Sequence, residues 1–205
     1  NKMVQRALTG FAAGIMVSAS VWSLLIPSMD YAAEMGKFAF VPAVVGFWIG
    51  ILFLLAMDHI IPHLHMDTDK AEGPKSKLKK TTMLVFAVTL HNIPEGMTIG
   101  ASASIANDAL NGSALVMAVL IGLHNIPEGM AISVPLISGG MSKMKAVFLT
   151  ALSGFPTVLG AFIGYAIGDV GPIGLSLSLS FASGAMLYVV YGEIIPQALL
   201  MHRSK

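Results

Sequence analysis

The hexapeptide His-Asn-Ile-Pro-Glu-Gly occurs twice in this sequence, at residues 91–96 and again at residues 124–129, 33 positions later. Each copy lies near the middle of a long apolar stretch, the first at 82–105 and the second at 113–137. A bilayer core needs about 20 mostly apolar residues per helix, so both stretches are long enough to cross a membrane. The repeated hexapeptide therefore predicts two membrane helices, each with ionisable groups at mid-depth.

Further apolar stretches of similar length lie on both sides of this pair. The six predicted spans are 7–29, 38–61, 82–105, 113–137, 146–168 and 173–201. None of them shows the ten-residue alternation that is typical of the strands of a membrane barrel. We therefore predict an all-α integral membrane protein with six transmembrane helices. Residues 1–205 would form a single transmembrane domain, with one polar loop at 62–81.

The composition agrees with a membrane protein and excludes several other classes. Hydrophobic residues make up 55% of the 205 residues and charged residues only 11%, whereas soluble proteins carry about 25% charged residues. The absence of cysteine excludes disulfides, cysteine-type zinc sites and thiolate catalysis. A net charge of +1 gives no indication of a nucleic-acid partner.

The basic residues are distributed unequally between the two predicted sides of the membrane. With six spans, both ends of the chain and the 62–81 loop lie on one side, which holds eleven of the twelve basic residues, while Lys37 alone lies on the other. Basic loops favour the cytoplasm. We therefore expect both ends to be cytoplasmic, in a plasma or inner membrane.

Both hexapeptides place ionisable side chains where lipid would disfavour them. His91 and Glu95 in the first copy, and His124 and Glu128 in the second, are four residues apart and thus share a helix face. An ionisable group at mid-bilayer costs several kcal/mol, so it must face protein, water or a bound ion. A kinked helix with an internal His–Glu pair would explain one copy, but two copies at equal depth favour a shared ligand.

The rest of the hexapeptide adds oxygen ligands. Pro94 and Pro127 lack an amide hydrogen and so leave the carbonyls of Leu90 and Leu123 without a helical partner. The predicted ligands are His91, Asn92, Glu95, His124, Asn125 and Glu128. Imidazole, carboxylate and amide groups suit Zn²⁺, Cd²⁺, Fe²⁺ or Mn²⁺. Because the two spans run in opposite directions, the pattern also indicates an inverted repeat with its site at the midplane.

With these motifs the sequence resembles the ZIP (Zrt/Irt-like protein) family of divalent metal transporters, in particular its GufA-like branch. The resemblance extends over nearly the whole chain and includes Gly-Phe-Ala-Ala-Gly-Ile-Met at 10–16, Leu-Ile-Pro-Ser-Met-Asp at 25–30, both hexapeptides, Ser-Gly-Ala-Met-Leu at 183–187 and Glu-Ile-Ile-Pro at 193–196. Family members have eight helices, so the six spans would match helices 2–7. The resemblance implies movement of a zinc-like ion into the cytosol, and it implies no enzymatic activity.

The resemblance also implies roles for residues outside the hexapeptides. Met16 matches a thioether that approaches the metal in some relatives, although a packing role would explain it equally well. Asp30 matches a carboxylate on the entrance side. The residues that match exit-side positions are Asp58, His63, His65 and Glu193. Thr157 occupies a position where several relatives have a glutamate, so we expect one strong metal site rather than a full two-metal centre.

Other functions remain possible on the sequence alone. An intramembrane zinc protease needs His-Glu-x-x-His, which the sequence lacks. A channel for a non-metal solute would explain the prolines and glycines but not the paired His and Glu residues. A membrane metal sensor or scaffold would use the same ligands without transport. The small-residue pairs Gly10/Gly14 and Gly160/Gly164 indicate tight helix contacts, either within the chain or in a homodimer.

Overall fold

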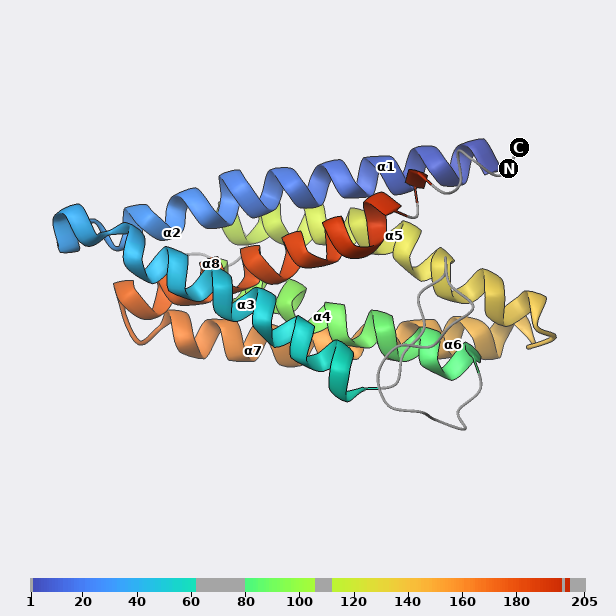
Figure 1. Cartoon of the computed structure of the whole chain (residues 1–205). Helices are drawn as coiled ribbons and strands as arrows, with labels where there is room; N and C mark the ends of the chain where they lie inside the picture. The colour runs from blue at the N-terminus through green and yellow to red at the C-terminus, as the bar shows by residue number, and fades with distance from the viewer. Residues whose placement is uncertain (1, 62–79, 106–111, 197, 200–205) are drawn as a thin grey trace.

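The computed structural model describes residues 2–61, 80–105, 112–196 and 198–199, and all secondary structure in these ranges is helical (Figure 1). Most of the predicted 62–81 loop, including His63 and His65, lies outside the described residues. The elements in order are α1 (Lys2–Ser18), the π-helix η1 (Ala19–Leu25), α2 (Ile26–Tyr31), the 3₁₀-helix η2 (Ala33–Phe38), α3 (Phe40–Ile60), α4 (Lys80–Ser104), α5 (Ser113–Ser138), α6 (Lys143–Ser153), α7 (Phe155–Gly168), α8 (Pro172–Val189) and the π-helix η3 (Val190–Ile194).

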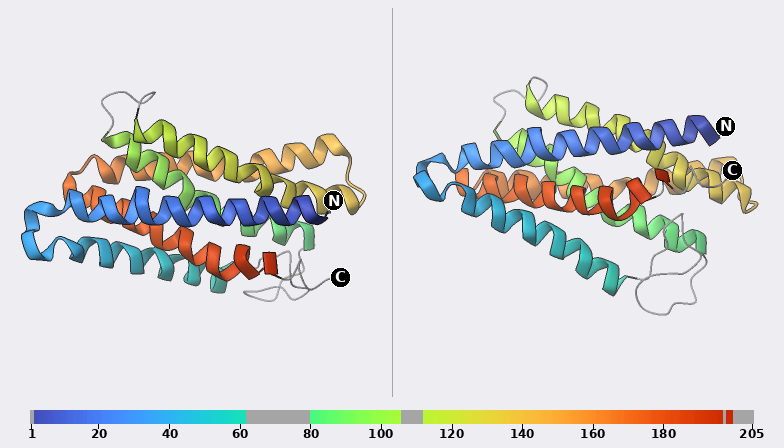
Figure 2. Two further views of the ribbon diagram at one scale, coloured as in Figure 1. Left: turned by 90° about the horizontal axis from the view of Figure 1, so that it is seen from above. Right: turned by 45° about the horizontal axis from the view of Figure 1, so that its top comes forward.

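The helices form a bundle of antiparallel segments (Figures 1 and 2). The ends of α3 and α5 and the beginnings of α4 and α6 lie at one end of the bundle, and η2 and the start of α8 lie at the other. Glycine makes the sharp reversals possible. Gly36 in η2 has φ 57° and Gly140 after α5 has φ 91°, a conformation that side chains disfavour.

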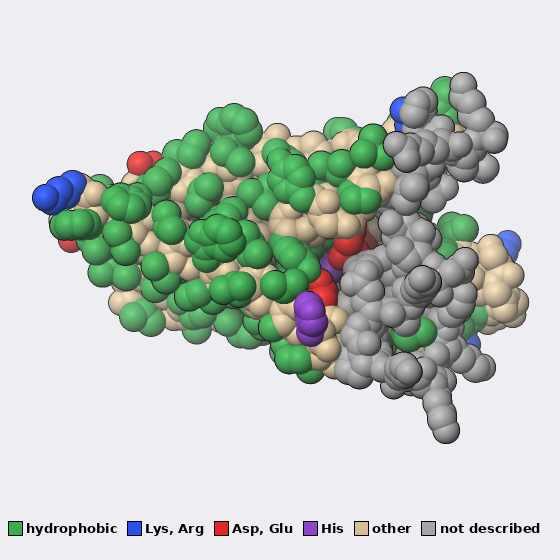
Figure 3. All heavy atoms as spheres, viewed as in Figure 1, with side chains coloured by type: hydrophobic (Ala, Val, Ile, Leu, Met, Phe, Trp, Pro, Cys, Tyr) green, Lys and Arg blue, Asp and Glu red, His purple; other side chains and the backbone are tan. Residues whose placement is uncertain are grey.

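Five helical stretches among the described residues are long and apolar enough to cross a membrane: Arg6–Tyr31, Phe40–Ile60, Ala114–Ser138, Lys143–Gly168 and Pro172–Ile194. Helix α4 has 25 residues but is not one of them, because the polar residues of its hexapeptide reduce the apolar character of its centre. The prediction of an all-helical membrane protein is confirmed, with five rather than six such stretches. Figure 3 shows the hydrophobic surface that covers the middle of the viewed face.

Glycines allow two pairs of helices to approach backbone to backbone. A methyl group at Gly96 of α4 would lie 1.9 Å from the carbonyl oxygen of Thr157, and one at Gly160 of α7 would lie 2.1 Å from that of Ile93. Helices α3 and α8 meet in the same way, since a methyl group at Gly184 would lie 2.1 Å from the Phe47 carbonyl oxygen. These distances leave no room for a side chain, so each pair is held at backbone distance. In contrast, Gly10 has open space around it.

The core lies where α8 faces η1, α4 and α5. Its buried side chains include Met16, Met97, Met117 and Met186. Next to them, the Ser183 hydroxyl of α8 donates a hydrogen bond to the Ser20 carbonyl oxygen, 2.8 Å away. Because Ser20 lies in the π-helix η1, this hydroxyl satisfies a backbone group inside a segment whose helical register has changed.

Candidate metal centre

Helices α4 and α5 carry the two hexapeptides past each other through the middle of the bundle. Both helices continue through their internal prolines, Pro94 in α4 and Pro127 in α5. Gly96 in the first copy sits directly against the backbone of α7, whereas a methyl group at Gly129 in the second would only contact the Thr150 side chain at 3.4 Å. The first copy is therefore the more tightly enclosed of the two.

Three side chains from these helices form a group with the spacing of metal ligands. One ligand atom each of Glu95, His124 and Glu128 lies within 4.8 Å of the other two. Glu95 is 1% exposed and His124 is 6% exposed, and Nε2 of His124 lies 3.3 Å from Oε1 of Glu95. Tetrahedral zinc with bonds of about 2.0–2.2 Å would hold its ligand atoms roughly 3.4 Å apart. The His124–Glu95 pair is at that spacing, and the Glu128 oxygen, within 4.8 Å of both, would have to move closer to bind the same ion.

Asn125 holds Glu95 in place from the same helix as His124. Oriented so that its nitrogen faces two acceptors, the Asn125 amide donates to Oε2 of Glu95 at 3.0 Å and to the carbonyl oxygen of Ile121 at 3.1 Å. Glu95 therefore has one oxygen beside an amide donor and the other beside an imidazole. The Asn125 amide satisfies Oε2, whereas Oε1 has no hydrogen-bond partner among the described residues and lies only near the His124 ring.

Asn92 is fixed by the break between α6 and α7. Its Nδ2 donates to the carbonyl oxygen of Ser153, 2.8 Å away. This carbonyl is available because the helix breaks at Gly154, where the Thr157 amide donates instead to the Gly154 carbonyl oxygen at 3.1 Å. Asn92 is 2% exposed, and its Oδ1 has no hydrogen-bond partner among the described residues. A buried acceptor of this kind is able to receive a cation or a water molecule.

His91 does not point into the group of three. Its Nε2 lies 2.9 Å from Oε1 of Glu193, which belongs to the π-helix η3. The structure therefore places the predicted ligand His91 next to the predicted exit residue Glu193, and the other three ionisable residues of the hexapeptides together. Nothing in the spacing of the sequence distinguishes His91 from His124, because the difference depends on how α4 faces η3.

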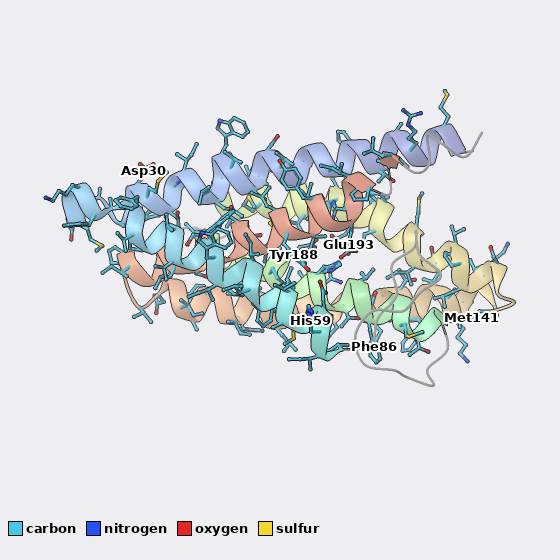
Figure 4. All side chains as sticks on the ribbon, viewed as in Figure 1. Asp30, His59, Phe86, Met141, Tyr188 and Glu193 are labelled. Atoms are coloured by element: carbon cyan, nitrogen blue, oxygen red, sulfur yellow. The ribbon has the colours of Figure 1, made fainter. Side chains whose placement is uncertain are left out.

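The remaining predicted residues lie apart from this group. Met16 is 1% exposed and packs in the apolar core. Asp30 is exposed at the η2 end of the bundle, far from Glu193 in Figure 4. Asp58, near the end of α3, accepts a hydrogen bond of 2.6 Å from the Tyr188 hydroxyl. The hydroxyl of Thr157 is buried, with no hydrogen-bond partner among the described residues.

Two of these contacts involve groups that the sequence did not indicate. For the Ser153 carbonyl, the sequence does contain a signal, because Gly154 and Pro156 directly after it indicate a break in the helix. A helix break leaves the preceding carbonyl free to accept a hydrogen bond from elsewhere. Tyr188 has no such signal, because a tyrosine within an apolar helix is an ordinary packing residue.

Comparison with known proteins gives a consistent result. The profile of a family described as ZIP zinc transporter matches residues 68–205. The chain is 31% identical to zinc transporter ZIP11 of Bos taurus, over 96% of this chain and 81% of the relative. It is 34% identical to zinc transporter ZIPB of Bordetella bronchiseptica, over 98% of this chain and 64% of the relative. It is 35% identical to zinc transporter GufA of Myxococcus xanthus, over 86% of this chain and 70% of the relative.

Proposed function

Because this chain belongs to the ZIP zinc transporter family, we propose that it moves a zinc-like divalent cation across a membrane and into the cytosol. The observation that carries this proposal is the buried group of Glu95, His124 and Glu128, whose ligand atoms lie within 4.8 Å of one another. Two carboxylates and an imidazole are a donor set that suits Zn²⁺. Cd²⁺, Fe²⁺ and Mn²⁺ would compete for the same ligands.

The transported ion would be held at the midplane by both hexapeptides. Glu95, His124 and Glu128 would bind first, because they already converge. His91 would join by leaving Glu193, and Asn92 and Asn125 would supply or orient oxygens. Met16 would approach the ion only after a change in core packing, since it is buried among apolar side chains.

The route would run along the length of the bundle. The ion would enter past Asp30, which is exposed at the η2 end, and would leave past Glu193 and Asp58. The loop histidines His63 and His65, outside the described residues, would receive it on the cytoplasmic side. This direction agrees with the basic residues at that end and with the location of Lys37 at the other.

In the proposed topology α4 also crosses the membrane. Its polar residues would face the transported ion instead of lipid, as expected for ionisable groups inside a membrane. The chain would then have six spans in one transport domain over residues 1–205, matching helices 2–7 of an eight-helix family fold with an inverted repeat. Both ends would be cytoplasmic, in a plasma or inner membrane. A homodimer fits the open glycine Gly10 on α1, and we propose no nucleic-acid partner and no enzymatic activity.

Uptake into proteoliposomes tests this function. We expect wild-type protein to take up Zn²⁺, with Cd²⁺, Mn²⁺ and Fe²⁺ compared in parallel, and the double variant His91→Ala/Glu128→Ala to lose uptake. The matched control is Glu34→Gln, which alters an exposed carboxylate in η2. Zinc binding without uptake by the wild type would favour a metal sensor or scaffold. Absence of both would favour a channel for a different solute, and full uptake by the double variant would move the site elsewhere.

A further inference from the structure

Tyr188 and Asp58 join α8 to α3 by a hydrogen bond that the proposed metal centre does not include. The Tyr188 hydroxyl donates to Oδ2 of Asp58 at 2.6 Å, between residues 130 positions apart in the chain. This length is typical of a charge-assisted bond between a hydroxyl and a carboxylate, which is stronger than a bond between neutral groups. Both side chains are half-buried, so the bond is partly protected from water.

The hydroxyl is not needed to hold the two helices together. Helices α3 and α8 already meet at backbone distance, since a methyl group at Gly50 would lie 2.0 Å from the carbonyl oxygen of Phe181. The tyrosine ring itself packs against the buried cluster of Leu54, Ala185 and Val189. A phenylalanine at position 188 would keep this packing. What the hydroxyl adds is a fixed position for the Asp58 carboxylate.

This carboxylate lies on the same side of the bundle as Glu193. Tyr188 and Glu193 are five residues apart, which on a regular α-helix would separate their directions by about 140°. The π-helix η3 begins between them at Val190 and, with more residues per turn, reduces this angle. Figure 4 shows Tyr188 and Glu193 close together, and Figure 3, from the same side, shows acidic and histidine side chains in this part of the face.

We propose that Tyr188 is a positioning residue for metal transport, which orients the Asp58 carboxylate to receive the cation as it leaves His91 and Glu193. An oriented carboxylate binds a passing ion without first losing its rotational freedom, so less ordering is required at that step. The inference rests on the proposed function, because it assigns Asp58 to the release side of the same route. A divalent cation is the ligand that this carboxylate would take.

The test compares zinc uptake by wild type, Tyr188→Phe, Asp58→Asn and the double variant, at equal amounts of folded protein. The matched control is Tyr191→Phe, which removes an exposed hydroxyl three residues away. We expect Tyr188→Phe to lower the maximal uptake rate several-fold while the half-saturating external zinc concentration stays unchanged, and Tyr191→Phe to behave as wild type. The double variant should match Asp58→Asn, because the proposal assigns the effect of the hydroxyl on uptake to that carboxylate.

Infrared difference spectra supply a measurement that does not depend on uptake. The C–O stretching band of Tyr188 is identified as the tyrosine band that Tyr188→Phe removes. We expect this band to shift when zinc is added to the wild type. In Asp58→Asn we expect no such shift. The proposal would be overturned if Tyr188→Phe took up zinc at the wild-type rate. It would also be overturned if Tyr188→Phe lowered the uptake rate of Asp58→Asn by the same factor as it lowers that of the wild type. A tyrosine band that responded neither to zinc nor to Asp58→Asn would have the same consequence. Absence of zinc uptake by the wild type would instead count against the proposed function.

Discussion

At the scale of single residues, the buried carboxylate of Glu95 is the group on which we propose that zinc binding depends most. It is 1% exposed and contacts both His124 and Asn125. Its two oxygens are each beside a side chain of α5, so it joins the two copies of the hexapeptide. Removing its charge would therefore affect the affinity for a cation and the orientation of both neighbours.

We predict that Glu95→Gln weakens zinc binding by roughly 100-fold. Loss of a residue that only orients a metal ligand typically costs up to about 100-fold in affinity, and we expect loss of a ligand charge to cost about as much as this upper value. Glutamine keeps the size of the side chain, so the helices should stay packed. Isothermal titration of the purified protein measures the change. The control Glu34→Gln removes an exposed carboxylate and should leave affinity unchanged. Equal affinities for Glu95→Gln and wild type would exclude Glu95 as a ligand.

The candidate ligands of the two hexapeptides were predictable from sequence, but their grouping in space was not. The repeated hexapeptide indicated which side chains were candidate ligands, because their types and spacing are visible in one dimension. It did not indicate that Glu95, His124 and Glu128 converge while His91 contacts Glu193. That distinction depends on the rotation of α4 relative to η3, which is decided by tertiary packing.

At the scale of elements, the contact between α4 and α7 holds the first hexapeptide in position. Gly96 and Gly100 of α4 face Thr157 and Ala161 of α7 with no space for a side chain. Because Gly96 directly follows Glu95, any displacement of α4 at this point would also displace a candidate ligand.

We predict that Gly96→Ala destabilises the protein by at least about 1–3 kcal/mol, the typical cost of overpacking, because the added methyl group would meet the Thr157 carbonyl. The matched control is Gly122→Ala in α5, where nothing lies within 4 Å and alanine favours the helix by about 1 kcal/mol. Thermal unfolding in detergent compares the two. Similar midpoints for both variants would contradict the close approach of α4 and α7.

Two helices have limits close to those predicted from hydropathy, whereas the predicted span 146–168 is divided at Gly154 into α6 and α7. The stretch predicted at 38–61 is observed as Phe40–Ile60 and that at 113–137 as Ser113–Ser138, because long apolar runs bounded by polar residues have few alternatives. The π-helices η1 and η3 were not predicted. In η1 the Ser20 carbonyl oxygen accepts a hydrogen bond from Ser183 of α8, and such a distant partner cannot be inferred from local sequence.

At the scale of the whole molecule, the number of membrane crossings remains the main topological prediction. With six crossings, the end of α3 and the start of α6 lie on one side of the membrane. If α4 did not cross, these two points would lie on opposite sides. The chain contains no cysteine, so single-cysteine variants report on one position each without a modified background.

We predict that Ile60→Cys and Lys143→Cys are labelled by a membrane-impermeant maleimide from the cytoplasmic side, and Lys37→Cys from the outside. Both Ile60 and Lys143 are exposed in the structure. Labelling in spheroplasts and in inverted vesicles checks the assignment. Labelling of Ile60→Cys and Lys143→Cys from opposite sides would indicate five crossings. If all three variants were labelled from the sides opposite to those predicted, the orientation in the membrane would be the reverse of the one proposed.

We also predict that zinc stabilises the whole bundle, because a ligand that binds only the folded protein shifts the unfolding equilibrium. At a free concentration 100 times the dissociation constant, the free energy of unfolding should rise by about 2.7 kcal/mol. Thermal unfolding with and without zinc measures this, and Glu95→Gln, with its affinity lowered roughly 100-fold, should rise by only about 0.4 kcal/mol at the same concentration. An equal shift in wild type and Glu95→Gln would indicate that zinc acts at another site.

The glycines between α4 and α7 have a consequence for how this chain could evolve. A methyl group at Gly96, Gly100, Gly160 or Gly164 would meet backbone atoms of the facing helix at 2.3 Å or less. A lineage that exchanged its ligands to suit another metal would still keep these four glycines, because any single replacement of one of them would clash with the facing helix. Exchanges at the candidate ligand positions would thus leave the contact between α4 and α7 in place, whereas exchanges at these glycines would disturb both.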